Sequence, residues 1–364
     1  MCQENKEGPG SVTKNDFVQK RFVFFVVASC LREEGDIDVS GDQRRRPSVG
    51  MVGLGIMGSA MSANLMRAGY QVVGYDVLAR RRRDHRQAGG IVARNCREVG
   101  RRAGIVICSL PSSEALLQTA AELAETARPQ QIVIETSTLP IVVKQEARRS
   151  LGARGAILLD CPLSGTGAQA RAKDLVVYAS GDRGAYRRAV PMMEGFARAH
   201  HYVGAFGAGS KMKFVANLLV AVHNVAAAEG LVLAMKAGLD PAMVLKAVSD
   251  GAGSSRMLQV RGPMMVKGDY SSATMKLEVW QKDMTIIADF AREVGCPTPL
   301  FAATGPIYTA AIAMGRNAED TAAVCAVLEE MANNQRRLQW RRPSEIVTKS
   351  RSTQRPRRPP RRNA

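Results

Sequence analysis

The chain has 364 residues, of which 46% are hydrophobic, and a formal net charge of +18. This length is sufficient for two domains with substantial cores, and the apolar content excludes a chain that is disordered throughout. No uninterrupted apolar run reaches the roughly eighteen residues that a membrane span needs, so we expect no membrane partner. The seven cysteines are scattered, without a Cys-x-x-Cys pair or a Cys/His cluster, which favours reduced thiols, a cytoplasmic location and no metal site.

Both termini lack the pattern of a folded domain. Residues 1–46 contain as many acidic as basic residues and are expected to be a disordered extension, and the apolar stretch at 22–31 is short for the core of an export signal. Residues 335–364 carry eleven Lys or Arg and one Glu, which is more than half of the net charge. A Pro/Arg-rich tail of this kind is expected to be disordered, and it could bind nucleic acid only non-specifically.

The first element of the fold is a glycine-rich turn between a strand and a helix. Residues 48–52 predict a buried strand, and residues 57–68 have apolar side chains at helical spacing, closed by Gly69. Between them lies Gly-x-Gly-x-x-Gly, whose glycines permit a sharp turn, the approach of a phosphate and close helix–strand packing. Together with the free N–H groups of the helix N-terminus, this turn predicts a dinucleotide-binding site. Its candidate cofactor-binding residues are Gly53, Leu54, Gly55, Ile56, Met57 and Gly58.

An acidic residue ends the second predicted strand, at 71–75. Asp76 lies about twenty residues past the glycines, where such a fold places the acid that accepts hydrogen bonds from the adenosine ribose. A carboxylate there favours NAD, because it would repel the 2′-phosphate of NADP. The four arginines at 80–83 could reach such a phosphate, so NADP stays open as an alternative. We expect these arginines to form the solvated face of the next helix.

Strand-like and helix-like segments then alternate up to about residue 203. Further strands are expected at 104–110, 131–135, 156–160 and 175–179. Polar residues with helix-start character follow the first two of these, at 111–113 and at 136–140. The alternation predicts a Rossmann-like, doubly wound α/β domain over residues 47–206.

The second half of the chain is predicted to be all-helical. Nothing interrupts a helical pattern from 208 to 238, so we expect one long helix that joins the two domains. Further helices are expected at 241–249, 273–294, 299–315 and 319–333. We assign residues 207–334 to an all-α substrate and dimerisation domain. The cleft between the strand ends and this helical body is the natural place for a substrate.

Three polar segments are expected to converge on that cleft. The first, residues 160–167, follows a strand and offers backbone N–H groups and hydroxyls that suit a carboxylate, from Ser164, Gly165 and Thr166. The third, residues 280–283, contains Lys282, which could reach the cofactor. An adjacent Lys-Asp pair is, however, usually surface charge.

The second segment, residues 207–217, opens with two glycines that would let the backbone approach a planar ring. Lys213 and Asn217 are four residues apart and share one face of the long helix. A lysine partly desolvated beside an oxidised nicotinamide would have a lowered pKa, which suits proton transfer near neutral pH. Asn217 could orient the lysine or the substrate hydroxyl. Lys211, the rival candidate, points away around the helix and is expected to be solvated.

In this order, the segments resemble the β-hydroxyacid dehydrogenase family over about residues 48–334. The stretches at 222–229 and 268–270 are most similar to its threonate-type, sugar-acid branch. The matching motifs are Val52-Gly53-Leu54-Gly55-Ile56-Met57-Gly58 through Asn64-Leu65, Asp160-Cys161-Pro162-Leu163-Ser164-Gly165, Gly207-x-Gly209-x-x-x-Lys213-x-x-x-Asn217, and Lys282-Asp283.

The resemblance implies a Rossmann-like domain followed by an all-α domain, NAD(P)-dependent oxidation of a small 3-hydroxy acid, and a homodimer or homotetramer. It implies that Lys213 is the catalytic acid/base and that the loop from Ser164 to Thr166 holds the substrate carboxylate. It also implies cofactor contacts from Leu110, Pro111, Thr138 and Lys282.

Two departures from the family pattern leave the substrate open. Thr166 replaces the second glycine of Ser-Gly-Gly, and Ala216 replaces the first of two asparagines. Within the superfamily, a semialdehyde or glyoxylate reductase is an alternative, and so is an imine reductase, although imine reductases usually lack the lysine. A 6-phosphogluconate-type decarboxylating enzyme needs a larger helical domain. The alternative from another class is a non-catalytic module that binds nucleic acid through the basic tail, and known examples of that use lose the lysine present here.

Overall fold

The structure is a computed structural model that describes residues 46–334. The predictions for the N-terminal extension and for the basic tail from 335 onward therefore lie outside the described residues, apart from Arg46, which begins the first strand.

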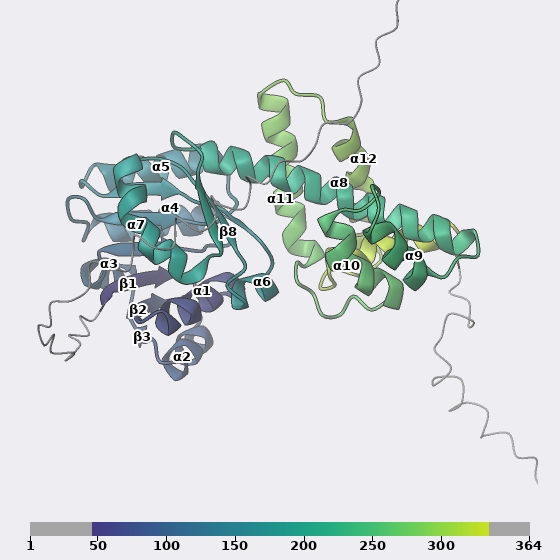
Figure 1. The fold of residues 1–364 in the computed structure, drawn as a ribbon. Coiled ribbons are helices and arrows are strands. Elements are labelled where there is room, and N and C mark those ends of the chain that lie inside the picture. The colour runs from purple at the N-terminus through teal and green to yellow at the C-terminus, as the bar shows by residue number, and fades with distance from the viewer. Residues whose placement is uncertain (1–45, 335–364) are drawn as a thin grey trace, which may run out of the picture. The chain divides into compact units, whose positions relative to one another are not determined.

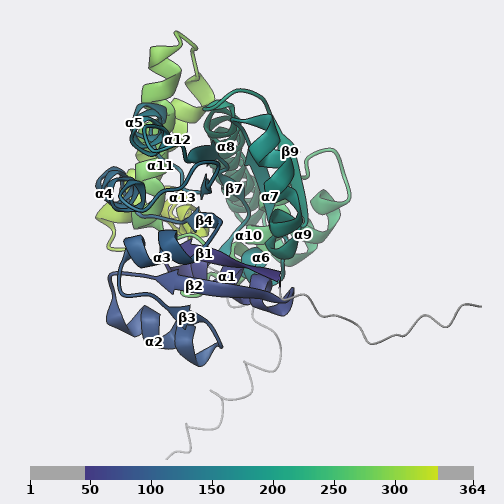
Figure 2. The ribbon, with the colours of Figure 1, turned by 90° about the vertical axis from the view of Figure 1, so that its left-hand side faces the viewer.

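Six parallel strands form the main sheet, in the order β3-β2-β1-β4-β5-β6. Strands such as Ile-Val-Ile-Cys of β4 are apolar throughout, as expected where helices cover both faces of a parallel sheet. The order reverses between β1 and β4, and Figure 2 shows β3, β2, β1 and β4 in succession. This is the predicted doubly wound topology. The strands are β1 (Arg46–Val52), β2 (Tyr70–Tyr75), β3 (Ile91–Val92), β4 (Ile105–Cys108), β5 (Ile132–Glu135) and β6 (Ile157–Asp160).

Helices connect these strands and cover the two faces of the sheet (Figure 1). Side chains cap several of them: Asn95, Ser112 and Asp182 each accept a backbone N–H from the first helical turn. The first of the helices, α1, packs against α7 on one face, whereas α3, α4 and α5 pack together on the other. The helices are α1 (Ile56–Arg67), α2 (Ala79–Gln87), α3 (Cys96–Arg102), α4 (Ser113–Ala124), α5 (Ile141–Gly152) and α7 (Arg183–Phe196).

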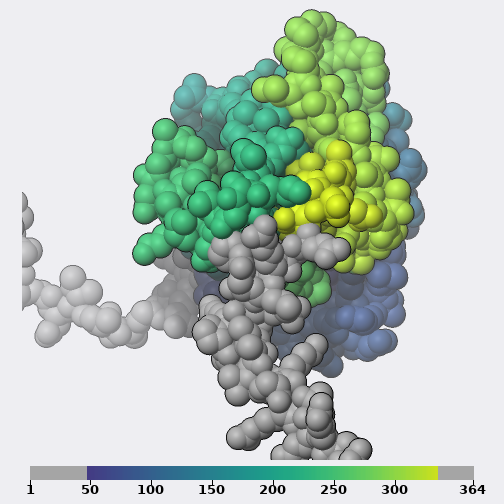
Figure 3. Space-filling view, turned by 90° about the vertical axis from the view of Figure 1, so that its right-hand side faces the viewer, coloured from purple at the N-terminus to yellow at the C-terminus, as the bar shows by residue number. Residues whose placement is uncertain are grey.

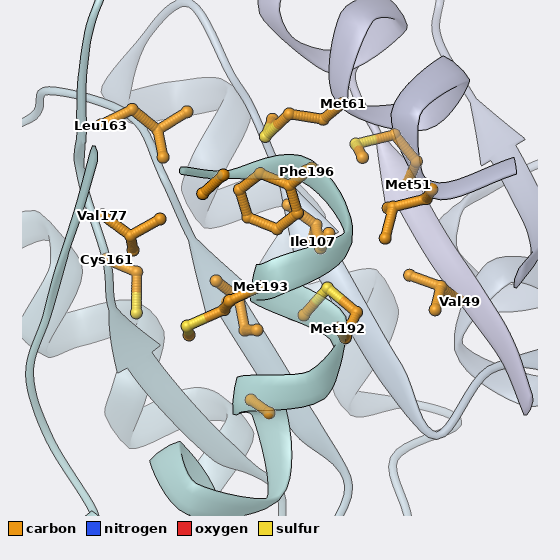
Figure 4. Close-up of a cluster of buried hydrophobic side chains, with 14 of the residues drawn as sticks. Val49, Met51, Met61, Ile107, Cys161, Leu163, Val177, Met192, Met193 and Phe196 are labelled. Carbon is orange, nitrogen blue, oxygen red and sulfur yellow. The ribbon is translucent and has the colours of Figure 1, made fainter. Parts of the chain in front are cut away.

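A separate hydrophobic core lies on each face of the sheet. Figure 4 shows the core beneath α1 and α7, where the ring of Phe196 lies among the side chains of Met51, Met61 and Ile107. On the other face, Gly50 lets α3 approach β1, since a Cβ at Gly50 would lie 2.6 Å from Cγ1 of Val99. Close packing on both faces fixes the strand ends from which the polar loops emerge.

The structure corrects one detail of the predicted sheet. The strand expected at 175–179 does not join the main sheet but belongs to a second sheet of three strands, in the order β7-β8-β9. The chain leaves β6 through the bridge between Asp160 and Ser180, and β7 then pairs antiparallel with β8. These elements are β7 (Leu163–Ser164), α6 (Gly167–Arg171), β8 (Val176–Ala179) and β9 (Ala199–Tyr202).

The second half is helical, as predicted, and is built around the long helix α8 (Ala208–Lys236). Figure 3 shows α13, in yellow, on the surface between green segments of the other helices. Sequence analysis missed α10, whose Gly262 and Pro263 are poor helix formers. Gly262 leaves room for the Leu245 side chain, since a Cβ there would lie 2.5 Å from Cδ1 of Leu245. The remaining elements are α9 (Pro241–Ser249), α10 (Arg256–Lys267), α11 (Leu277–Glu293), α12 (Pro299–Ala313), a short 3-10 helix (Thr321–Ala323) and α13 (Val324–Met331).

Among residues 46–334, α8 is the one helix long and apolar enough to cross a membrane. Sequence analysis did not identify it as such a helix because polar residues interrupt its apolar run. Half of its apolar window is buried within the structure. The core helix of a folded domain meets the same criteria, because it is apolar around most of its circumference.

A buried histidine predicts how the stability of this fold depends on pH. His85 of α2 lies against β2, where its Nε2 donates to the carbonyl oxygen of Val72 and its Nδ1 accepts from the Ser62 hydroxyl. Burial lowers the pKa of His85 below its usual value. Below about pH 6.5 His85 therefore binds a proton in the unfolded chain, whereas in the folded chain it does so only at lower pH. The free energy of unfolding consequently decreases as the pH falls.

We expect His85→Gln to reduce the loss of stability between about pH 7.5 and about pH 5.5, by up to about 1.4 kcal/mol per pH unit. Urea unfolding at both pH values measures this difference. His201→Gln, at an exposed site, is the control and should keep the wild-type pH dependence. An identical dependence for wild type and His85→Gln would contradict the prediction.

Candidate active site

A cavity of about 430 Å³ lies at the carboxyl ends of β1 and β4, where the strand order reverses. This is the position at which doubly wound sheets bind ligands. Residues 273–276 and Val279 of the helical half line it as well. Of the residues that the sequence predicts for cofactor and substrate, the cavity is lined by Gly53, Gly55, Ile56, Met57, Asp76, Leu110, Pro111, Gly165 and Thr166.

The three glycines of the turn have different surroundings. Gly53 has a φ of +88°, and a Cβ there would lie 2.1 Å from the carbonyl oxygen of Ser109. A Cβ on Gly58 would lie 1.9 Å from the carbonyl oxygen of Gly53, so only glycine lets α1 pack this closely. Gly55 is open, since a Cβ there would meet nothing nearer than the Arg81 guanidinium at 3.8 Å. The turn and the N-terminus of α1 therefore leave room for a phosphate, and they fit a dinucleotide.

Asp76 is buried at the end of β2 and braces the glycine turn. One of its oxygens accepts the N–H of Leu54 at 2.8 Å, and the other accepts the N–H of Leu78 at 2.8 Å. Arg81, on the first turn of α2, places Nη1 3.1 Å from Oδ2 of Asp76. Arg81 is thus not only part of a solvated helix face, as the sequence suggested, but lies at the edge of the cavity beside the carboxylate.

The predicted substrate loop runs from β7 into α6. Gly165 has a φ of +135°, which favours glycine, and Thr166 caps α6 through a capping box with Gln169. The hydroxyl of Thr166 accepts the backbone N–H of Gln169 at 3.4 Å. The threonine that departs from the family pattern therefore has a local structural role as a helix cap. Ser164 is half-buried in β7 and does not line the cavity.

Lys213 and Asn217 lie on the first turns of α8, and neither lines the 430 Å³ cavity. Lys213 is half-buried, and Asn217 is buried. Burial lowers the pKa of Lys213 to about 8, although the nearby Asp283 carboxylate acts in the opposite direction and the Lys282 ammonium adds to the lowering. Lys211 is exposed, as predicted.

The Lys282-Asp283 pair is not simple surface charge. Asp283 is 5% exposed and accepts a hydrogen bond from Nδ2 of Asn217 at 2.9 Å. The Nζ of Lys282 lies 3.4 Å from Oδ1 of Asp283 and donates to the carbonyl oxygen of Thr138 at 2.5 Å. Lys282 therefore connects α11 to the loop that follows β5. Sequence analysis could not find this arrangement, because adjacent opposite charges give no sign of burial.

The structure corrects the interpretation of Gly209. We expected the two glycines before Lys213 to admit a planar ring. Instead, a Cβ on Gly209 would lie 2.4 Å from the carbonyl oxygen of Tyr178 and 2.6 Å from that of Asp160, so this glycine lets α8 pack against the strands. Gly207 has a φ of +95° and precedes the first turn of α8.

A buried ionic network beneath the strand ends was missed altogether. Lys144 of α5 is fully buried, with Nζ 2.6 Å from Glu135 and 2.8 Å from Asp160. Burial lowers the pKa of Lys144, but the two carboxylates outweigh it and raise the pKa above its usual value. Asp160 also accepts the backbone N–H of Ser210 at 2.8 Å and its hydroxyl at 2.9 Å. The network thus anchors the start of α8 to β6.

The helical wall of the cavity is held by a second buried carboxylate that sequence analysis missed. Asp320 accepts the backbone N–H and the hydroxyl of Thr274, at 2.7 Å and 2.8 Å, and the N–H of Met275 at 3.1 Å. Arg261 pairs with the same carboxylate at 3.2 Å. These contacts fix the segment at 273–276. Across residues 46–334, no group of three or more His, Cys, Asp or Glu side chains could hold a metal ion.

Comparisons with known proteins decide the family. Residues 48–204 match the NAD binding domain of 6-phosphogluconate dehydrogenase, and residues 207–328 match the NAD-binding domain of NADP-dependent 3-hydroxyisobutyrate dehydrogenase. The chain is 32% identical to L-threonate dehydrogenase of Cupriavidus necator, over 77% of this chain and 95% of that protein. The chain belongs to the β-hydroxyacid dehydrogenase family.

Other members of the family agree with this assignment. The chain is 30% identical to 2-hydroxy-3-oxopropionate reductase of Escherichia coli, over 79% of this chain and 98% of that protein. A solved structure of 3-hydroxyisobutyrate dehydrogenase from Mycobacterium tuberculosis with L-serine is 29% identical, with a TM-score of 0.71, and covers 78% of this chain and 99% of that one. The fold, the NAD-binding domains and the class, an NAD(P)-dependent hydroxyacid dehydrogenase, are thereby confirmed.

Proposed function

We propose that this dehydrogenase oxidises a small 3-hydroxy acid reversibly, with Lys213 as the acid/base. The observation that carries the proposal is the position of Lys213, half-buried on α8 one turn before Asn217, with its pKa lowered to about 8. A lysine with this pKa exchanges a proton readily near neutral pH, because both of its protonation states are populated there.

In the direction of oxidation, neutral Lys213 takes the proton of the substrate hydroxyl at Nζ while the carbon–oxygen bond becomes a carbonyl. A bound nicotinamide would supply the acceptor for the hydride of the β-carbon. Asn217 aligns the reacting groups. In the direction of reduction, protonated Lys213 returns the proton to the new hydroxyl. The protein thus contributes position and proton transfer.

The cofactor would be held by the glycine turn from Gly53 to Gly58, by Asp76 and by Leu110 and Pro111, and Thr138 and Lys282 would complete the site. The substrate carboxylate binds at Ser164, Gly165 and Thr166, next to the N-terminus of α6. The similarity to L-threonate dehydrogenase supports a sugar acid of the threonate type as substrate.

We propose NAD as the preferred cofactor, because Asp76 lies at the cavity where the adenosine ribose would bind. Asp76→Asn keeps an acceptor for the Leu54 N–H but removes the charge that repels a 2′-phosphate. We expect the ratio of kcat/KM for NADP to that for NAD to rise about tenfold, equivalent to about 1.4 kcal/mol. Steady-state kinetics with both cofactors measure this ratio. The exposed Asp84→Asn is the control, and an unchanged ratio in Asp76→Asn would contradict the assignment.

We also propose a cytoplasmic homodimer or homotetramer. Met212, Val215, Leu219 and Leu233 are large apolar residues of α8 that are exposed in the single chain, which supports their burial between copies. Light scattering on the purified full chain measures the assembly, and a monomer would contradict it.

The experiment that tests the function is a panel of hydroxy acids: the 3-hydroxy acids L-threonate, 3-hydroxyisobutyrate and D-glycerate, and the 4-hydroxy acid 4-hydroxybutyrate for comparison. Each is offered with NAD or NADP, and reduction of the cofactor is followed by its near-ultraviolet absorbance. Turnover of one acid names the substrate. Cofactor binding without turnover of any acid in the panel would contradict the proposal.

A further inference from the structure

The carboxylate of Asp283 links Asn217, a proposed active-site residue, to Lys282, which contacts the cofactor-binding domain. Asp283 is buried on α11 and accepts Nδ2 of Asn217 at 2.9 Å. Its other oxygen lies 3.4 Å from Nζ of Lys282, and that Nζ also donates to the carbonyl oxygen of Thr138 at 2.5 Å. A continuous polar path thus runs from α8 through α11 to the loop after β5.

The hydrogen bond from Asn217 fixes which end of its amide faces Asp283. An ionised carboxylate only accepts hydrogen bonds, so the NH₂ end must point toward it. The carbonyl oxygen of Asn217 is therefore directed away from Asp283. An amide held in this way presents an acceptor, rather than a donor, to a hydroxyl or to an ammonium group on its other side.

The charge of Asp283 also lies near Lys213, because Asp283 is hydrogen-bonded to Asn217, which is one turn from Lys213 on α8. Among the described residues 46–334, Asp283 and Lys282 are the charged groups that influence Lys213, and both come from α11. Burial lowers the pKa of Lys213, Asp283 raises it and Lys282 lowers it. Burial raises the pKa of Asp283 itself, while Lys282, Lys213 and Asn217 favour its ionised form.

We propose that Asp283 is a positioning residue of the active site: its carboxylate orients the Asn217 amide, and its charge supports the protonated form of Lys213. This inference rests on the proposed function. Oxidation needs neutral Lys213 and reduction needs its protonated form, so the charge of Asp283 sets the pH range over which each form of Lys213 is populated. Asp283 does not line the 430 Å³ cavity, and in this proposal it acts through Asn217 and Lys213.

Asp283→Asn removes the negative charge but keeps the size of the side chain and an oxygen that can still accept the hydrogen bond of Asn217. We expect the rising limb of kcat/KM for oxidation to shift to lower pH, and the rate of reduction at neutral pH to fall. Asp289→Asn, on the exposed side of the same helix, is the matched control and should leave both unchanged. Asp283→Ala removes the orientation as well, and we expect its kcat to fall at least tenfold further, with folding checked by circular dichroism.

A second readout does not depend on turnover. In cofactor-free protein labelled at the lysine ε-carbon, an NMR titration reports the pKa of Lys213, whose resonance is the one absent from Lys213→Arg. We expect a lower pKa in Asp283→Asn and an unchanged one in Asp289→Asn. Should Asp283→Asn not fold, Asp283→Ala provides the same titration, because it also removes the carboxylate that raises the pKa of Lys213, whose pKa should then fall.

Equal Lys213 titrations in wild type and Asp283→Asn, or in wild type and Asp283→Ala, would overturn the inference. Its failure is distinguishable from failure of the proposed function. The NMR titration reports the coupling even if no 3-hydroxy acid is turned over, whereas full activity without Lys213 would overturn the function and leave the coupling intact.

Discussion

Lys213→Ala is expected to lower kcat by about 10²- to 10⁴-fold, the range that a positioned general acid or base contributes. The residue lies half-buried on α8 with a pKa of about 8, so wild type has both a proton acceptor and a proton donor near neutral pH. The variant has neither. Because no cofactor contact is assigned to Lys213, the affinity for NAD should stay within a few-fold of wild type. Steady-state kinetics and a fluorescence titration of cofactor binding measure the two effects separately.

Lys211→Ala is the matched control for this variant. It removes a lysine two residues earlier on the same helix, from an exposed position. We expect near-wild-type kcat in that variant. Equal kcat values for Lys213→Ala and wild type would show that another group transfers the proton.

Lys144→Met is expected to cost about 3–5 kcal/mol of stability, the range for breaking a buried ion pair from one side. The substitution leaves Glu135 and Asp160 buried without their shared cation. Asp160 also holds Ser210 at the start of α8, so we expect a loss of activity beyond the loss of folded protein. Chemical denaturation measures the stability, and activity per folded molecule measures the second effect.

The stability of Lys144→Met should depend on pH in a predictable direction. An uncompensated buried carboxylate takes up a proton more readily, which removes the buried charge. The stability difference from wild type should therefore shrink as the pH is lowered. Arg149→Met, at an exposed position on the same helix, should change stability by less than about 0.5 kcal/mol. A similarly small change in Lys144→Met would contradict the prediction.

The sequence predicted the fold more completely than the site. Apolar runs and glycine turns located five of the six strands of the main sheet, because such strands are buried on both faces and the turns between them are short. The two-residue strands β3 and β7 carry too few residues for a periodic signal, whereas β8 was located but not its place in a second sheet. The helix α10 was missed because Gly262 and Pro263 lower helix propensity, and only the approach of Leu245 explains why glycine is there.

The candidate site was only partly accessible from sequence. Lys213 and Asn217 share a helix face, so their spacing alone brings them together. Lys144, in contrast, looks like any lysine on a helix, and Asp283 looks like half of a surface pair. Their burial depends on contacts between segments far apart in the chain, which local spacing does not encode. Their roles are set by carboxylates or amides that lie 16 and 66 residues away.

Because the start of α8 is bonded to the sheet, the structural boundary between the two halves lies further along the chain than the boundary between the two family matches. The family matches meet between residues 204 and 207, just before α8 begins. Yet Gly209 donates to Ser180 and Ser210 donates twice to Asp160, so the first turn of α8 moves with the sheet. Chimeras that exchange the helical half between relatives should therefore be joined between Ser210 and Lys213, because a junction at 206 would pair the first turn of one parent with the strand ends of another, and a junction beyond Asn217 would separate Asn217 from Asp283.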